Sequence, residues 1–103
     1  MSLDTTRAEH HPHEARQRLE HARSSRLAQL QALKETAQTA DDHLLSEQRT
    51  AMERTLKEIE EAFARIEDGT YGTCLGCGKP IPGERLEILP HTRLCVTCQR
   101  RAT

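Results

Sequence analysis

The four cysteines of this sequence are the residues whose type and spacing suit a chemical role, namely metal binding. They stand as two Cys-X2-Cys pairs separated by seventeen residues: Cys74 and Cys77, then Cys95 and Cys98. Two thiolates three residues apart can occupy two of the four positions around a tetrahedral metal ion, and a second pair can occupy the other two. The pattern therefore predicts one zinc ion held by four sulfurs. Because four protein ligands leave no position for water, we expect the zinc to be structural.

Other uses of these side chains are weaker alternatives. Two disulfides would require an oxidising compartment, and a lone dithiol redox pair would leave the second pair unexplained. His10, His11 and His13 could also catch a metal ion, but a short polar histidine tract near a chain end is more often unstructured.

The composition excludes several classes of protein. The chain has 103 residues and no Trp, and Phe63 and Tyr71 are its only aromatic residues, which argues against an enzyme with a large core. No nucleophile–base pair, glycine-rich phosphate loop or open metal site is visible, so we expect no enzyme activity. The first residues carry no apolar segment and no stretch reaches the roughly 18 apolar residues of a membrane span, so we expect a cytoplasmic protein.

Charge is distributed unevenly along the chain. Lys and Arg number six against five Asp and Glu in residues 1–40, four against nine in 41–68, and five against two in 69–103. Only the cysteine-containing end is basic. This distribution argues against a general nucleic-acid binder, whose affinity would come from many phosphate contacts.

Two long helices should precede the cysteines. Residues 13–36 contain no Gly or Pro, and apolar residues recur there at spacings of three and four. Such a narrow apolar face suits a coiled-coil seam. That stripe consists of Ala15, Leu19, Ala22, Leu30, Leu33 and Ala37. A second stripe consists of Leu45, Met52, Leu56, Ile59, Phe63 and Ile66.

The break between these stripes lies at residues 37–42. Thr39 could cap the second helix there, and the negative charges of Asp41 and Asp42 would be favourable at the N-terminus of that helix, the positive end of its dipole. Gly69 should end that helix. We therefore expect a flexible leader (1–12), an antiparallel coiled-coil hairpin (13–68, tip about 37–42) and a four-cysteine zinc-finger head (69–103). The chain should be a monomer; one continuous helix that dimerises is the alternative.

The head should be a small treble-clef-like zinc finger. Pro80, Pro82 and Gly83 forbid a long helix between the cysteine pairs, and residues 85–89 could form a short strand. Residues 95–101 should form one or two helical turns. On the hairpin, Glu58, Glu60 and Arg65 are most simply interpreted as a solvated face.

One stretch of the head resembles a known family. The run Gly69-Thr-Tyr-Gly72-Thr-Cys74-Leu-Gly-Cys77-Gly78, followed by Ile81, Arg85-Leu86-Glu87, Pro90, Leu94-Cys95 and Cys98-Gln99, is similar to the signature of the DksA/TraR zinc-finger family. The resemblance implies a bacterial transcription regulator that binds RNA polymerase directly. It also implies that the hairpin enters the secondary channel, where acidic residues at its tip act near the catalytic centre.

The chain departs from that family at two places. Its hairpin is shorter, and the tip pattern Asp-X-X-Asp-X-Ala is replaced by Thr39-Ala-Asp-Asp42-His43, so Asp41 and Asp42 are the candidate tip residues. Members that respond to the alarmone ppGpp have basic side chains at positions that align with Glu58, Leu89 and Gln99. Acidic, apolar and neutral groups cannot pair with phosphates as Lys or Arg would, so the resemblance implies regulation independent of ppGpp.

Two other functions fit parts of the pattern. A spacer of seventeen residues also occurs in DNA-binding fingers, although only Arg100 and Arg101 follow the last cysteine here, where such a finger needs a basic extension. A zinc-dependent adaptor or redox sensor, in which oxidation of the thiolates releases the metal, is the other alternative.

The zinc prediction can be tested by chelation. Structural zinc supplies on the order of 10–16 kcal/mol, comparable to the whole stability of a small domain. Removal of the metal should therefore unfold residues 69–103, which circular dichroism and limited proteolysis would detect. Unchanged spectra and cleavage after complete metal removal would contradict a structural role.

Overall fold

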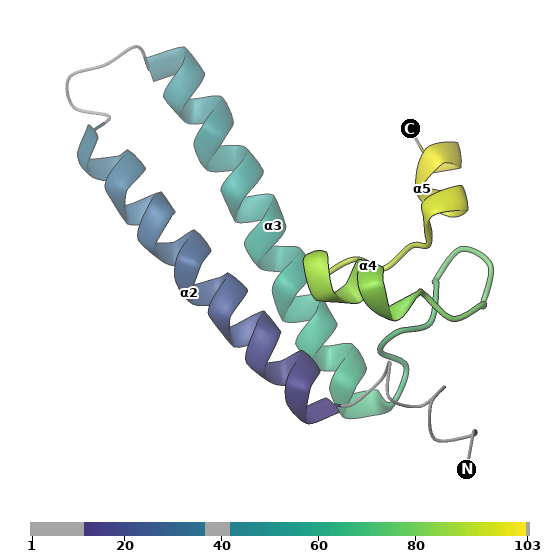
Figure 1. Cartoon of the computed structure of the whole chain (residues 1–103). Coiled ribbons are helices and arrows are strands. Elements are labelled where there is room, and N and C mark those ends of the chain that lie inside the picture. The colour runs from purple at the N-terminus through teal and green to yellow at the C-terminus, as the bar shows by residue number, and fades with distance from the viewer. Residues whose placement is uncertain (1–11, 37–41, 103) are drawn as a thin grey trace.

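The computed structural model describes residues 12–36 and 42–102. Helices in these ranges are α2 (Pro12–Thr36), α3 (Asp42–Asp68), α4 (Gly83–Ile88) and α5 (Val96–Ala102). The only β-pairing among the described residues is one antiparallel bridge between Thr73 and Pro80. Figure 1 shows α2 and α3 side by side as a long hairpin, with α4 over its lower half and α5 set apart to the right. No helix in the described part of the chain is long and apolar enough to cross a membrane.

The two long helices run antiparallel. Arg16 reaches Glu67 at 3.1 Å, and seven residues later Arg23 reaches Glu60, seven residues earlier, at 2.9 Å. A heptad step forward on α2 therefore matches a heptad step back on α3. The guanidinium of Arg23 also lies 4.6 Å from the centre of the Phe63 ring. These contacts confirm the hairpin architecture.

Burial along the seam follows the expected stripes. Ala15, Leu19 and Leu30 are buried on α2, and Ile59 is buried on α3. Leu27, which does not belong to the α2 stripe, is 50% exposed. Of the expected leader (1–12), only Pro12 is among the described residues, and it is the first residue of α2. Ala37 and Thr39 also lie outside the described residues.

Gly69 ends α3 as expected. It adopts a φ of +82°, a conformation that glycine reaches without a side-chain clash. The N–H of Gly69 donates to the carbonyl of Ile66 at 3.3 Å, and the N–H of Thr70 donates to that of Arg65 at 2.9 Å. These two bonds form a Schellman motif, which satisfies carbonyls left open at the helix end.

One core joins the hairpin to the head. Buried residues of the hairpin base pack with buried residues that follow Gly69, and the cluster consists of Ala15, Leu19, Ile59, Ala62, Tyr71, Cys74, Ile81 and Leu86. The Tyr71 hydroxyl donates to the carbonyl of Pro90 at 2.8 Å, so this buried polar group is satisfied. The base of the hairpin and the head are therefore packed as one unit.

The expected strand at residues 85–89 is wrong. This segment belongs largely to helix α4, where the N–H groups of Arg85 and Leu86 donate to the carbonyl of Pro82 at 3.1 and 3.2 Å. Leu86 is fully buried. No adjacent strand is present in the described chain to pair with an extended segment, so a short helix satisfies the backbone locally.

Arg65 also differs from expectation, since it is only 9% exposed and does not belong to a solvated face. Its guanidinium donates to the carbonyl of Thr92 at 3.4 Å, across the junction with the head. Burial lowers the pKa of Arg65 from its usual value. Periodicity could not show this burial, because the covering segment lies 27 residues away in sequence.

The shared core makes a testable distinction between two leucines of α2. Leu19 is fully buried and Leu27 is half exposed. Leu19→Ala should lower the free energy of unfolding by about 2–5 kcal/mol, because it leaves a cavity in the core. Leu27→Ala should lower it by less than about 1 kcal/mol. Urea unfolding of the zinc-loaded chain measures both; equal losses would contradict the shared core.

Candidate metal centre

The first cysteine pair lies on a tight loop closed by the Thr73–Pro80 bridge. The N–H of Cys74 donates to the carbonyl of Lys79 at 2.8 Å, and the N–H of Gly78 donates to the carbonyl of Cys74 at 2.9 Å. Gly78 has a φ of +79°, which lets the chain turn back at this point. These bonds hold Cys74 and Cys77 on one side of the loop.

The second pair is positioned by the start of α5. Cys95 directly precedes this helix and Cys98 lies in its first turn, as expected for a short helix after the spacer. The N–H of Leu75 donates to the carbonyl of Arg93 at 2.9 Å, which ties the first loop to the segment before Cys95. The two pairs are thus brought together by backbone contacts outside the cysteines.

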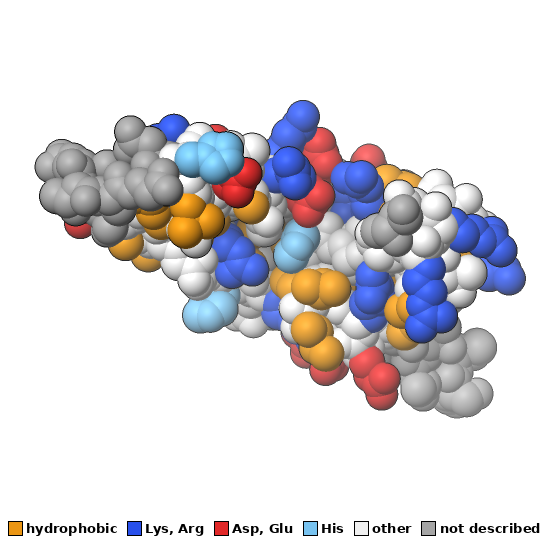
Figure 2. All heavy atoms as spheres, turned by 90° about the horizontal axis from the view of Figure 1, so that it is seen from above, with side chains coloured by type: hydrophobic (Ala, Val, Ile, Leu, Met, Phe, Trp, Pro, Cys, Tyr) orange, Lys and Arg blue, Asp and Glu red, His pale blue; other side chains and the backbone are white. Residues whose placement is uncertain are grey.

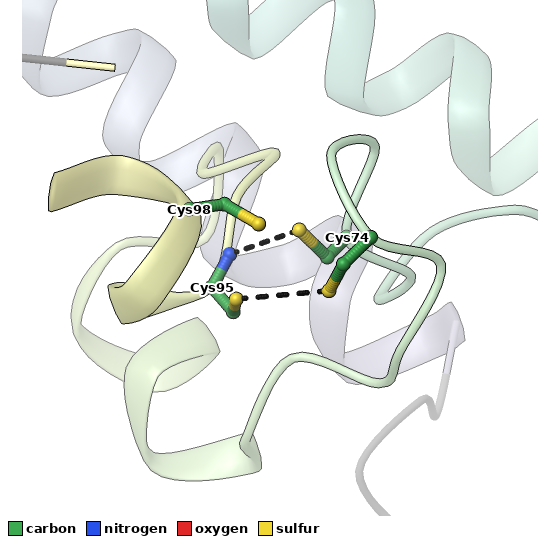
Figure 3. A group of neighbouring side chains, drawn as sticks. Cys74, Cys95 and Cys98 are labelled. Carbon is green, nitrogen blue, oxygen red and sulfur yellow. Dashed lines mark hydrogen bonds between the residues drawn. The ribbon is translucent and has the colours of Figure 1, made fainter. Parts of the chain in front are cut away.

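The four sulfurs are close enough to hold one metal ion. All lie within 4.8 Å of one another, and the sulfurs of Cys77 and Cys95 are 3.9 Å apart. A tetrahedral zinc with bonds of about 2.3 Å would place its sulfurs about 3.8 Å apart. In Figure 3, the side chains of Cys74, Cys95 and Cys98 turn toward a common centre. In the described chain, no other group of three or more His, Cys, Asp or Glu residues could hold a metal ion.

A glycine leaves room for this cluster. A Cβ atom added at Gly76 would lie 3.0 Å from the sulfur of Cys98 and 3.1 Å from its Cβ. These distances are too short for ordinary packing. A side chain at position 76 would therefore push Cys98 away by a few tenths of an ångström, whereas the positive φ of Gly78 favours glycine at the turn.

Hydrogen bonds favour the thiolate form of Cys74. Its sulfur accepts the N–H groups of Gly76 and Cys95 at 3.3 Å each. Burial opposes ionisation of Cys74, but the backbone N–H groups outweigh it and lower the pKa of the thiol to about 6. The neighbouring Cys74 and Cys95 side chains raise the pKa of Cys98 to about 12. Four thiolates this close require a cation, so the donor set fits one zinc ion.

Asp42, one of the two candidate tip residues, lies far from the cysteines. Asp42 is the first residue of α3, at the end of the hairpin remote from the head (Figure 1). Asp41 lies outside the described residues. Because α3 has 27 residues, about 40 Å of helix separates its two ends.

The three positions aligned with nucleotide-responsive residues do come together. Glu58, Leu89 and Gln99 line one hollow of about 430 Å³, beside Arg85 and His91. The carboxylate of Glu58 lies 3.9 Å from the Nε2 of His91 and 4.0 Å from the guanidinium of Arg93. Burial lowers the pKa of His91. No motif or spacing in the sequence points to His91 or Arg93, since only the fold brings them to Glu58.

Comparison with known proteins identifies the head. Residues 69–103 match the prokaryotic dksA/traR C4-type zinc finger. The chain is 37% identical over 78 residues to the RNA polymerase-binding transcription factor DksA of Caulobacter vibrioides, covering 66% of this chain and 55% of that protein. It is 46% identical over 44 residues to general stress protein 16O of Bacillus subtilis, covering 43% of this chain and 27% of that protein. The chain thus spans about half or less of the length of these curated relatives.

A solved structure extends the likeness to the hairpin. The DnaK suppressor protein from Agrobacterium tumefaciens C58 matches with a TM-score of 0.66 and 25% identity, over 86% of this chain and 91% of that one. The finger signature and the four adjacent thiols therefore agree: residues 69–103 form a prokaryotic dksA/traR C4-type zinc finger, and the likeness in fold extends to the helical hairpin.

Proposed function

We propose that this chain is a bacterial transcription regulator that binds RNA polymerase directly. In this proposal the hairpin enters the secondary channel of the polymerase, and Asp41 and Asp42 at its tip modulate initiation. The protein acts in the cytoplasm as a monomer and recognises no DNA sequence. The observation that carries the proposal is the packing of a long two-helix hairpin onto a four-thiol head through one core.

The hairpin has the shape and stiffness that a probe of a deep channel needs. Helix α2 has 25 residues, so it is about 37 Å long. Helix α3 lies beside it (Figure 1). The pairs Arg16–Glu67 and Arg23–Glu60 tie the two helices across their sides. Figure 2 shows basic, acidic and hydrophobic side chains interspersed on the face seen from above. Such a surface remains hydrated until a partner covers it.

Zinc has a supporting role in this proposal. Cys74, Cys77, Cys95 and Cys98 are the proposed ligands, and a bound ion would neutralise their thiolates while cross-linking the two loops that carry them. Packing contacts between the head and the hairpin then extend this stabilisation to the base of the hairpin. Cys74 belongs to the same buried cluster as Leu19 and Ile59, so the metal loop and the hairpin base are in one packed unit.

The residues around Glu58 support independence from ppGpp. Glu58 places a carboxylate in the hollow that it shares with Leu89 and Gln99, where it would repel phosphates. The two arginines of this hollow already have partners: Arg85 donates to the carbonyl of Leu94 at 3.0 Å, and Arg93 lies 4.0 Å from Glu58. An anion there would compete with these contacts and would meet the carboxylate of Glu58.

The tip mechanism can be tested with Asp41→Asn and Asp42→Asn. A pull-down with purified RNA polymerase should retain both variants, with affinity within about twofold of the parent, because each substitution changes one side chain to another of nearly the same size. Transcription in vitro should show a loss of most of the effect on open-complex lifetime. Glu53→Gln, an exposed residue farther along α3, is the control and should keep full activity. Tip variants with full activity would exclude the tip mechanism, and a parent chain that does not bind would exclude the partner.

The nucleotide prediction uses the same transcription assay. Added ppGpp should leave the effect of the parent chain unchanged. The combined substitutions E58K, L89R and Q99K should introduce a response, because three new cations would surround one hollow and could pair with phosphates. A parent chain whose activity changes several-fold with ppGpp would contradict the proposal.

A further inference from the structure

A second hollow lies on the other side of His91, between α2 and the end of α4. Its volume is about 450 Å³, and His91 is a lining residue of both hollows. The α2 wall carries Arg18, His21, Ser25 and Arg26, all with polar hydrogen-bonding groups. Ile88 faces them from α4. None of Glu58, Leu89 and Gln99 belongs to this hollow.

The arginines of α2 divide into two kinds. Arg16 and Arg23 pair with Glu67 and Glu60 of α3 at 3.1 and 2.9 Å. Arg18 instead lies 3.6 Å from Glu14, one turn earlier on its own helix. Arg26 is partly buried, and no carboxylate of the described chain lies within salt-bridge distance of it. A guanidinium withdrawn from water without a counter-charge is costly, so an anion would stabilise it.

The facing wall also contains an unsatisfied group. The Nδ1 atom of His91 is buried and has no hydrogen-bond partner. Glu87 lines this hollow and Glu14 pairs with Arg18, so Arg26 is the guanidinium group of the hollow that has no carboxylate of the described chain within salt-bridge distance. Ala22, Ile88 and Pro90 supply an apolar section beside the polar one. The hollow thus combines a cationic donor that has no counter-charge with an apolar surface, as small-molecule sites do.

From this arrangement we infer that the hollow binds a small phosphorylated molecule that carries an apolar ring. Arg26 holds the phosphoryl group, because a guanidinium can donate two parallel hydrogen bonds to phosphate oxygens. The ring lies against Ile88 and Pro90. The site lies at the junction of the hairpin and the head, so its ligand contacts both. This inference does not depend on the proposed function, since it concerns the chain without polymerase.

The test is a titration of the zinc-loaded chain with phenyl phosphate, followed by calorimetry and by amide chemical shifts. Phenyl phosphate should bind, inorganic phosphate should bind more weakly, and phenol should not bind. Arg26→Gln should raise the dissociation constant for phenyl phosphate by at least about tenfold. Arg23→Gln on the same helix is the matched control, because Arg23 pairs with Glu60, and it should leave the constant within about twofold. Helix content and zinc content should be the same in both variants.

A further variant separates the two halves of the site. Ile88 is 77% exposed, so Ile88→Ala should leave the fold intact. It should weaken phenyl phosphate but leave inorganic phosphate unchanged. The inference would be overturned by equal effects of Arg23→Gln and Arg26→Gln, which indicate general charge attraction. It would also be overturned if a short single-stranded DNA bound while phenyl phosphate did not, or if no probe bound at millimolar concentration.

Discussion

The mutual closeness of four thiols is the constraint on which the rest of this structure depends. Thiolates within 4.8 Å of one another require a cation between them. Hydrogen bonds with the side chains of Cys74 and Cys95 raise the pKa of Cys98 to about 12, so the proton on its sulfur is retained unless a metal ion replaces it. The head has no strand ladder, and its helices α4 and α5 have only six and seven residues. Such short elements are weak by themselves, so a metal that joins both cysteine loops stabilises the whole segment.

The head in turn holds the base of the hairpin. Tyr71, Ile81 and Leu86 pack on the residues that line the seam between α2 and α3, and Arg65 bonds across to Thr92. The opposite end of the hairpin has no comparable support among the described residues.

His91 divides the surface beside this junction into two hollows of different character. On one side Glu58 lies 3.9 Å from His91 and 4.0 Å from Arg93, and Arg85 donates to the carbonyl of Leu94. On the other side Arg18 lies 3.6 Å from Glu14, whereas Arg26 has no carboxylate of the described chain within salt-bridge distance. The two hollows are each lined by two arginines and one glutamate, so they differ in the partners of their arginines and not in the number of charges.

The sequence by itself determined the features that depend on local order. Cysteine spacing defined the thiol set, periodicity placed the two long helices, and Gly69 marked the end of α3, because each signal lies within a few residues of what it specifies. Only the tertiary structure decided that residues 83–88 are helical, that Arg65 is buried, and that His91 lies between two hollows. These features depend on contacts between segments far apart in the chain, such as Arg65 with Thr92, and no local pattern encodes such contacts.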